Sequence, residues 1–324
     1  MNTAISRRRM ISITAATATV GMLPLPSFAS TEAPVHWTGK AMGIDASLIL
    51  HGKDASRSQE AITAATDEIT RLEKVFSLFQ EDSALSILNW KGALSMPPLD
   101  LVMCLYEAQN VSRETNGAFD VSVQPLWALY AKHFSKSDAN PTGPNNGHIA
   151  SARSLVNYKN ISVSTDEIVL KKSGMALTLN GIAQGYITDK VSDLLRSYGF
   201  ENVLVNMGET RALGTKPDGS PWNVGINKID HVLPLDNQAI ATSGGYGTQF
   251  DVSGLYHHLF DPKTGRSSSL WSSISVIAPS ATTADALSTA FSAMGGQEIK
   301  SVAEVLNVSV LGINANGETI IKLN

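Results

Sequence analysis

The sequence predicts a mixed α/β protein with one large domain. Two segments of the first half carry apolar residues at the three- and four-residue spacing of amphipathic helices, whereas the second half alternates short β-type runs with two further helical segments. The most polar stretch, 135–147, separates segments that both resemble parts of one core, so we interpret it as an exposed excursion. The chain has no internal repeat and no regular series of Asn-Gly turns that would indicate an all-β sandwich. We therefore expect an α+β fold with a mostly antiparallel or mixed sheet.

The composition is typical of a globular protein. Hydrophobic residues make up 43% of the 324 residues and charged residues 17%, which allows a large core and excludes disordered and collagen-like classes. The formal net charge of −4 gives no general attraction to nucleic acid or anionic lipid, so neither is an expected partner. Cys104 is the only cysteine and lies in an apolar helical segment, which predicts a buried, inert thiol and excludes an intramolecular disulfide.

Residues 1–29 resemble a signal peptide of the twin-arginine type. Three adjacent arginines, Arg7 to Arg9, precede an apolar run that is too short for a confident membrane span, and Ser27-Phe28-Ala29 offers a cleavage site. The alternative is a basic cytoplasmic tail. We expect an exported, periplasmic protein whose mature domain is 30–324 and has no membrane span. Removal of three arginines from 25 Lys+Arg leaves 22 against 29 Asp+Glu, a net charge of −7.

The predicted elements of the mature chain follow its apolar pattern and its Gly and Pro positions. Helices are expected at 58–79, at 99–115 after Pro97-Pro98, at 181–198 and at 282–294. Strands are expected at 161–163, 168–170, 176–179, 203–205, 222–226, 240–242, 258–260 and 274–277, with two more near Val308 and Ile320.

Standard catalytic signatures are absent from the chain. It contains no G-x-x-x-x-G-K-[ST], no G-x-S-x-G and no H-E-x-x-H, which removes the simplest cases of nucleotide hydrolysis by a P-loop, α/β-hydrolase chemistry and zinc proteolysis. Four clusters of small, polar and acidic residues remain, each at a predicted element boundary.

The first two clusters each have an ordinary structural explanation. In 117–126, Asp120 taken alone would be a turn or capping residue. In 179–186, Gly181 and Gly185 open a helix after a strand, where free backbone N–H groups suit a phosphate, although this spacing alone is weak evidence.

The other two clusters bring together more reactive side chains. Residues 241–246 carry two hydroxyls, and 256–265 carries paired histidines and a carboxylate, which is more than a turn requires. On the 282–294 helix, Asp285 and Thr289 share a face at i and i+4. A helical Asp is usually solvated surface, but Mg²⁺ often takes only one or two protein oxygens when a diphosphate supplies the rest.

In this order the clusters resemble the ApbE family, the FAD:protein FMN transferases, from about Met42 to the C-terminus. The segments that carry the resemblance are 117–126, 181–189, 204–208, 242–244, 258–265 and 284–289. The resemblance implies an ApbE-like fold that cleaves the FAD diphosphate with Mg²⁺, attaches FMN to a Thr or Ser hydroxyl of an exported or membrane flavoprotein, and releases AMP. Some family members instead hydrolyse FAD to FMN and AMP.

The resemblance also implies roles for individual residues. His258 would be the catalytic base, whereas His257 is expected mainly to pack. Mg²⁺ would be held by Asp285, Thr289 and a backbone carbonyl near Ala183. The residues expected to line the FAD site are Met42, Phe119, Asp120, Asn180, Gly181, Ala183, Gln184, Glu209, Thr242, Ser243, Gly244 and Asp261.

Three positions depart from the family pattern around the nucleotide site. Gln184 stands where Lys is common, 208–210 is one residue shorter than the usual Gly-Gly-Asp, and Gly245 stands where Asp is common. Either Glu209 and nearby groups compensate, or FAD is held more weakly than in a typical member. The 205–211 variant and the leader are similar to the NosX-like members associated with nitrous oxide respiration, whose expected acceptor is a membrane-bound flavoprotein of the NosR type.

Two other functions stay open on the sequence alone. A flavin-binding or flavin-delivery protein without transferase activity would share the 119–120 and 242–244 features but would not need His258. A structural assembly factor would need neither nucleotide nor metal.

Overall fold

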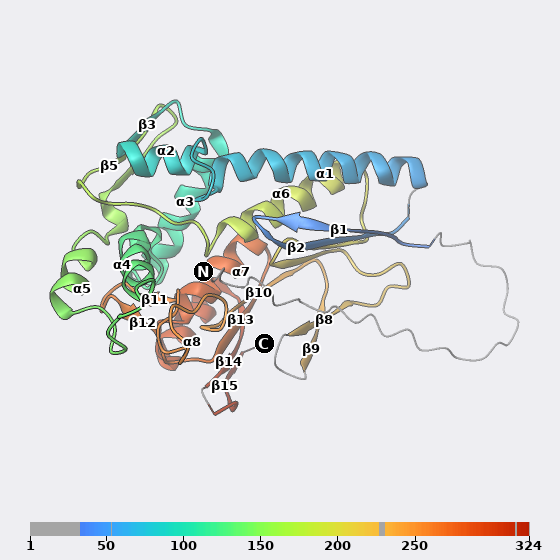
Figure 1. The fold of residues 1–324 in the computed structure, drawn as a ribbon. Coiled ribbons are helices and arrows are strands. Elements are labelled where there is room, and N and C mark those ends of the chain that lie inside the picture. The colour runs from blue at the N-terminus through green and yellow to red at the C-terminus, as the bar shows by residue number, and fades with distance from the viewer. Residues whose placement is uncertain (1–32, 53, 227–230, 315, 324) are drawn as a thin grey trace, which may run out of the picture.

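The computed structural model describes residues 33–323 apart from 53, 227–230 and 315, so the predicted signal peptide at 1–29 lies outside the described residues. Within them, eight strands form one antiparallel sheet in the order β1-β2-β6-β7-β10-β13-β14-β15 (Figure 1). The strands are β1 (Val35–Ala41), β2 (Ile44–Leu50), β6 (Val203–Asn206), β7 (Thr210–Leu213), β10 (Ala239–Ser243), β13 (Ser273–Ala278), β14 (Ser309–Ile313) and β15 (Thr319–Leu323). The predicted α+β class with a mostly antiparallel sheet is confirmed.

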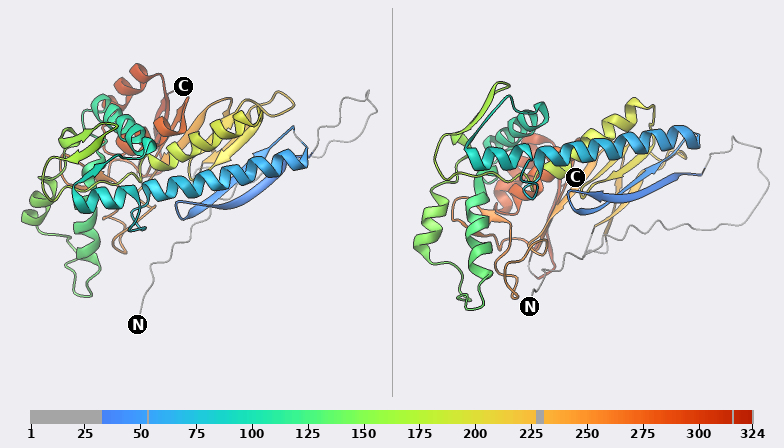
Figure 2. Two further views of the ribbon diagram at one scale, coloured as in Figure 1. Left: turned by 90° about the horizontal axis from the view of Figure 1, so that it is seen from above. Right: turned by 45° about the horizontal axis from the view of Figure 1, so that its top comes forward.

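Three helices cover one face of this sheet. Figures 1 and 2 show α1 (Ala55–Phe76) beside α6 (Ala183–Ser197), and α6 packs in turn against α7 (Ala281–Phe291). Because strand side chains alternate between faces, Val203 and Val205 join this main core, whereas Leu204 joins a smaller cluster on the opposite face. The hairpin of β8 (Trp222–Ile226) and β9 (His231–Leu235) contributes to that smaller cluster.

The remaining elements gather at one end of the sheet. They are α2 (Ala84–Lys91), α3 (Leu99–Glu114), α4 (Gln124–Phe134), α5 (Asn146–Arg153), α8 (Gly296–Leu306), the small sheet of β3 (Ala93–Ser95), β5 (Glu167–Leu170) and β4 (Ile161–Val163), the β11 (Phe260–Asp261) and β12 (Arg266–Ser267) hairpin, and the 3₁₀ turns η1 (Val121–Val123) and η2 (Tyr158–Asn160). Tyr130 and Phe260 form an aromatic cluster with neighbouring residues between α4 and the β11–β12 hairpin. Cys104 is fully buried as predicted, and burial raises the pKa of its thiol.

The four predicted helices are confirmed with shifts of a few residues at their ends. The first begins at Ala55 because the Asp54 side chain accepts a hydrogen bond from the Arg57 backbone N–H at 2.8 Å and caps the helix. Helices α2, α4, α5 and α8 and strands β1, β2, β3, β7, β9 and β12 were not predicted. Of the predicted 258–260 strand, only the last residue is in β11.

The predicted strand at 176–179 is wrong. Leu177 and Leu179 are buried as its pattern required, but the backbone bonds elsewhere. The Asn89 side-chain amide donates to the Leu177 carbonyl at 2.8 Å and accepts from its N–H at 2.6 Å, and Thr178 N–H donates to the Val121 carbonyl. Hydrogen bonds to a side chain and to a turn therefore replace those that a neighbouring strand would make.

Candidate active site

The site begins where the first turn of α6 meets α7, near the centre of Figure 1. At Gly185 an added Cβ would lie 2.2 Å from the Ala281 carbonyl oxygen and 2.8 Å from the Asp285 Cβ, so only glycine permits this approach. The Gly185 N–H, one of the unpaired donors of a helix start, donates to Asp285 Oδ2 at 2.9 Å. The close contact thus brings a helix N-terminus directly onto a carboxylate.

Asp285 lies beside a second carboxylate, that of Glu209 in the β6–β7 turn. Burial raises the pKa of Asp285 to about 7; the Gly185 bond opposes the rise and the charge of Asp189 adds to it. Burial and then the charge of Asp285 raise the pKa of Glu209 well above its ordinary value, although the Thr242 N–H donates to this carboxylate. Two neighbouring desolvated carboxylates repel each other, and a cation between them relieves that repulsion.

Hydroxyl groups complete this oxygen cluster. Ser243 Oγ, at the end of β10, lies 2.7 Å from Ser288 Oγ and 3.5 Å from Thr289 Oγ1. A Cβ added at Gly181 would lie 2.7 Å from Thr289 Oγ1, so the loop before α6 passes directly over this hydroxyl. Asp285 and Thr289 share one face of α7, as their spacing predicts.

The donor set fits a hard divalent cation such as Mg²⁺. All its members are oxygens, and Mg²⁺ prefers a few carboxylates with the remaining positions filled by water or substrate phosphate. The part of the chain that the structure describes has no group of three or more His, Cys, Asp or Glu side chains placed to hold a metal ion.

The paired histidines lie in different surroundings. His257 is buried against Gly245, and its Nδ1 accepts from the Leu259 N–H. His258 is half-buried, its Nδ1 lies 3.2 Å from both the nitrogen and the carbonyl oxygen of Thr248, and its ring lies 6.3 Å from that of His257. With the proton on Nδ1 donated to the carbonyl, the Nε2 lone pair can accept a proton. Burial lowers the pKa of His257, and lowers that of His258 to about 4, so both rings are neutral at pH 7.

Several predicted nucleotide-site residues lie in or next to the oxygen cluster. Gln184 packs against Gly208, where an added Cβ would lie 3.0 Å from Gln184 Oε1 and where φ is +102°. Thr242 Oγ1 lies 2.9 Å from Ser275 Oγ, while the Thr242 N–H bonds Glu209. The other predicted members at these segment ends are Gly181, Ala183, Ser243 and Gly244, with Asn180 exposed just before them.

Four predicted residues have structural contacts of their own. The buried Asp120 carboxylate accepts from Ser122 N–H and Oγ–H and from Tyr158 N–H, so it caps a turn and joins it to η2. Asp261 accepts from the Lys263 N–H in the β11–β12 turn. Met42 lies in the β1–β2 turn, where its N–H donates to Glu73 Oε1, and Phe119 is buried in the main core. Their contacts with FAD stay predictions.

Asp189 supports the site in a way that was not predicted. It lies on α6 and accepts hydrogen bonds from Ala281 N–H, Thr282 N–H and Thr282 Oγ–H at 2.6 to 2.9 Å, which caps α7, and it forms an ion pair with Arg211. The 181–189 motif included Asp189, but its partners on α7 lie 92 and 93 residues away, so no local pattern indicates this role.

Comparisons with known proteins reveal similarity in both sequence and fold. A model of the ApbE family matches residues 42–311. The FAD:protein FMN transferase of Vibrio cholerae is 30% identical over 315 residues, covering 91% of this chain and 92% of the relative, and that of Escherichia coli (strain K12) is 27% identical, covering 97% and 94%. Among solved structures, the flavin transferase ApbE from Vibrio cholerae has a TM-score of 0.77 at 26% identity, covering 90% of this chain and 97% of that one. The Pseudomonas stutzeri flavinyl transferase ApbE has a TM-score of 0.78 at 25% identity, covering 92% and 98%.

Proposed function

The chain belongs to the ApbE family, and we propose from this premise that it transfers FMN from FAD to a Thr or Ser hydroxyl of an acceptor protein. The observation that carries the proposal is the oxygen cluster of Asp285, Glu209 and Thr289 at the start of α6. A diphosphate needs cations around it as its bridging bond breaks, and the carboxylates of this cluster can hold one.

We propose Mg²⁺ as the cation, held by Asp285, Thr289 and a backbone carbonyl near Ala183. Glu209 offers a further carboxylate and would compensate for the carboxylate that is missing where Gly245 stands in place of an aspartate. When bound, Mg²⁺ neutralises charge on the diphosphate and stabilises the leaving phosphate. The repulsion between the two protein carboxylates favours binding of this ion.

In the proposed reaction, the acceptor hydroxyl replaces AMP on the phosphorus of FMN. The acceptor hydroxyl oxygen forms a bond with the FMN phosphorus while the bond from that phosphorus to the bridging oxygen breaks, and AMP leaves with the bridging oxygen. No oxidant or reductant is needed. The hydroxyl proton passes to Nε2 of His258, which is neutral at pH 7 because burial lowers its pKa to about 4.

The test combines the purified 30–324 protein with FAD, MgCl₂ and a candidate acceptor. Transfer predicts flavin fluorescence that stays on the denatured acceptor and one AMP released per flavin attached. An acceptor with its target Thr changed to Ala is the control and should stay unlabelled. AMP with only free FMN would instead indicate an FAD diphosphatase, and bound FAD without AMP would indicate a flavin-binding or delivery protein.

We also propose that the protein acts in the periplasm. The support is the order of arginines, apolar run and cleavage site in residues 1–29. Over the part of the chain that the structure describes, no helix combines the length and apolar character that crossing a bilayer requires. A membrane-bound flavoprotein of the NosR type is the proposed acceptor, on the resemblance of the 205–211 segment to NosX-like members.

A further inference from the structure

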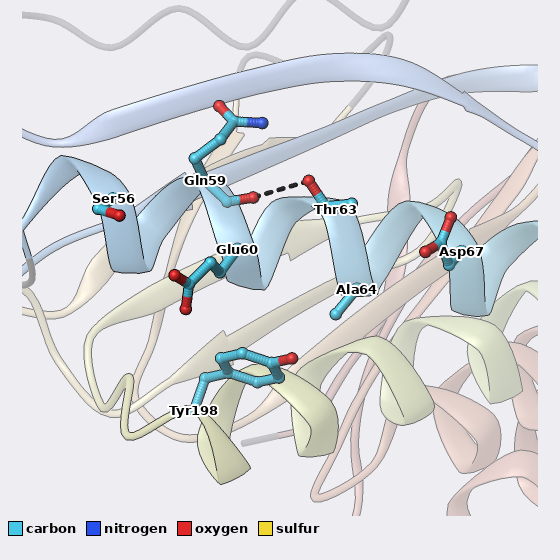
Figure 3. A pocket seen from close by; sticks show the side chains of 7 residues that line it. All are labelled: Ser56, Gln59, Glu60, Thr63, Ala64, Asp67 and Tyr198. Carbon is cyan, nitrogen blue, oxygen red and sulfur yellow. Dashed lines mark hydrogen bonds between the residues drawn. The ribbon is translucent and has the colours of Figure 1, made fainter.

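Two hollows lie outside the oxygen cluster. The first, of about 630 Å³, is an open groove between α1 and Tyr198 (Figure 3). Glu60 and Asp67 line it, and the bond drawn there, from Thr63 to the Gln59 carbonyl, is internal to the helix. It adjoins the C-terminal end of α6, about 20 Å along the helix from the oxygen cluster at its first turn. Nothing in its lining connects it with the proposed reaction.

The second hollow, of about 490 Å³, has the opposite charge character. Its lining includes His133, Lys136, His148 and Arg266 and no Asp or Glu. We call it the basic pocket. In a chain with a formal net charge of −4, the charges of Lys136 and Arg266, in a lining without acidic side chains, give the pocket a local positive field. Such a field attracts an anionic partner.

The walls of the basic pocket are ordered by hydrogen bonds. His133 Nε2 lies 2.9 Å from the Asn140 carbonyl oxygen, and Arg266 donates to Asn146 Oδ1 at 2.6 Å. The His148 N–H donates to Asn145 Oδ1 at 2.9 Å, which fixes the start of α5. The segment that the sequence marks as a polar excursion is therefore folded back to form one wall.

The basic pocket adjoins the chain segment that carries His258. An added Cβ on Gly143, in the wall of the pocket, would lie 2.9 Å from the Tyr256 ring. Tyr256 belongs to a hairpin-like loop, 248–258, closed by bonds from His258 N–H to the Thr248 carbonyl and from Phe250 N–H to the Tyr256 carbonyl. Arg266 follows on β12, where it lies opposite Asp261 of β11 in the register of the two strands. One continuous segment therefore joins the proposed base to the basic pocket.

The tip of the 248–258 loop exposes two aliphatic side chains. Val252 is fully exposed and Leu255 is 69% exposed. The tip is nevertheless ordered, because the Asp251 carboxylate accepts from the N–H groups of Ser253 and Tyr256. Neighbouring exposed aliphatic side chains on an ordered loop suit contact with another polypeptide.

Resting on the proposed function, we propose that the basic pocket and the tip of the 248–258 loop form the docking surface for the acceptor protein, and that the pocket binds an acidic segment of that acceptor. The charge of the pocket selects an anionic partner, and the exposed Val252 and Leu255 select a polypeptide over a small nucleotide. The FAD diphosphate has its own proposed position at the start of α6, so the pocket is free for the second substrate. Docking there would hold the acceptor close to the segment that carries His258.

The first experiment measures binding without any transfer chemistry. A fluorescein-labelled hexaglutamate peptide is titrated with the 30–324 protein at low salt, and its fluorescence anisotropy is followed. We expect saturable binding that a hexalysine peptide does not show. The double variant Lys136→Glu/Arg266→Glu should bind at least about tenfold more weakly, because both changes reverse charge at the pocket. Lys136→Glu alone, at an exposed side chain, should weaken binding in the same direction.

The matched control makes the same change in charge elsewhere. Lys171 and Lys300 are exposed and lie outside the pocket lining, so Lys171→Glu/Lys300→Glu should keep full affinity. Equal loss in both double variants, or no peptide binding by the unchanged protein, would overturn the proposal. Displacement of the peptide by equimolar AMP or inorganic phosphate would also overturn it, because the pocket would then be a phosphate site.

A second measurement separates this proposal from the proposed function. With an unmodified acceptor that the protein flavinylates, the Lys136→Glu/Arg266→Glu variant should raise the KM for the acceptor about tenfold, while the control variant leaves it unchanged. Unchanged KM in the pocket variant contradicts docking there even if transfer is robust. Conversely, a chain that binds the peptide through the pocket but never labels an acceptor contradicts the transferase and not the pocket.

Discussion

Asp285 is the residue on which the proposed metal dependence rests, because its buried carboxylate already accepts a helix N–H and its charge raises the pKa of Glu209. Replacing Asp285 with Asn keeps the shape and removes the charge. We expect FAD turnover to fall at least about tenfold, equivalent to roughly 1.4 kcal/mol of barrier, and its Mg²⁺ dependence to weaken. The measurement is AMP release against Mg²⁺ concentration. The control is Asp193→Asn, which removes the charge of an exposed carboxylate on α6. If Asp285→Asn shows the same dependence of AMP release on Mg²⁺ concentration as the wild type, the assignment of Asp285 is wrong.

The same carboxylate makes stability depend on pH. The pKa of Asp285 is about 7 in the folded protein and near 3.8 when unfolded, so between these values the folded state holds a proton that the unfolded state has lost. The contribution of Asp285 to the free energy of unfolding is therefore fully present below about pH 4 and is lost as pH rises to about 7. His258 acts oppositely, since its folded pKa of about 4 lies below 6.5 and its contribution grows as pH rises.

The contribution of Asp285 is therefore best measured as a difference. Without metal, the free energy of unfolding of the wild type should fall relative to Asp285→Asn as pH rises from 4 to 7. At pH 8, MgCl₂ should raise the melting temperature of the wild type and leave that of the variant almost unchanged. Urea unfolding at each pH, with EDTA or MgCl₂, provides the data, and parallel curves for the two proteins would argue against a buried, metal-neutralised carboxylate.

The two histidines should differ in what their loss does. His258→Ala removes the proposed base, so FMN transfer at saturating FAD should drop about 10²- to 10⁴-fold while FAD affinity changes little. His257→Ala removes a buried ring, so it should mainly lower the free energy of unfolding, by about 1–3 kcal/mol. Transfer rates and urea unfolding of both variants decide the matter. Equal losses of rate would indicate a paired site, and a loss confined to His257→Ala would exchange their roles.

At the residue scale, the sequence predicts which residues share an element better than it predicts their contacts. The i and i+4 spacing of Asp285 and Thr289 on one helix face follows from helix geometry and could be predicted. The pairing of Asp285 with Glu209 joins residues 76 positions apart, and only the folded sheet brings them together. Asp120 shows the reverse case, since its three hydrogen bonds give it the turn-capping role that local sequence alone indicated.

At the element scale, the contact of α6 with α7 depends on Gly185. In Gly185→Ala the new Cβ would meet the Ala281 carbonyl oxygen and the Asp285 Cβ, so α6 must move away from α7 and the oxygen cluster. We expect a loss of about 1–3 kcal/mol in the free energy of unfolding together with a loss of FAD turnover. Gly225→Ala on β8 is the matched control, because an added Cβ there meets nothing within 4 Å. Urea unfolding and AMP release of both variants test this; equal stability of the two would show that the helices can separate freely.

Long elements were easier to predict than short ones for a physical reason. The apolar stripe of α1 repeats over 22 residues, so its periodicity stands out from the background. Strands β1 and β2 carry partly exposed, alternating patterns of seven residues and were missed. The 176–179 run had the apolar pattern of a strand, yet Asn89 took its backbone bonds, which no local pattern can reveal.

At the scale of the whole molecule, the fold class could be predicted but the strand order could not. Mixed helix and strand periodicities indicate an α+β class. The order of the sheet depends on pairings such as β2 with β6 and β10 with β13, which join segments about 150 and 30 residues apart. These pairings depend on which strand faces are buried under the helices. The residues that decide this burial are distributed over the whole chain. The same long-range closure creates the basic pocket, since its walls come from the 133–148 segment and from β12.

Export is the prediction that concerns the molecule as a whole. A twin-arginine signal serves folded cargo, so we expect the protein to cross the membrane already folded. Apart from its arginines, the leader has little to distinguish it from a general secretory signal, so Arg7→Lys/Arg8→Lys should leave unprocessed protein in the cytoplasm. Fractionation and immunoblotting measure the processed share. The control Lys171→Glu/Lys300→Glu alters surface charge in the mature domain and should be exported normally; normal processing of the arginine variant would instead place the chain on the general secretory route.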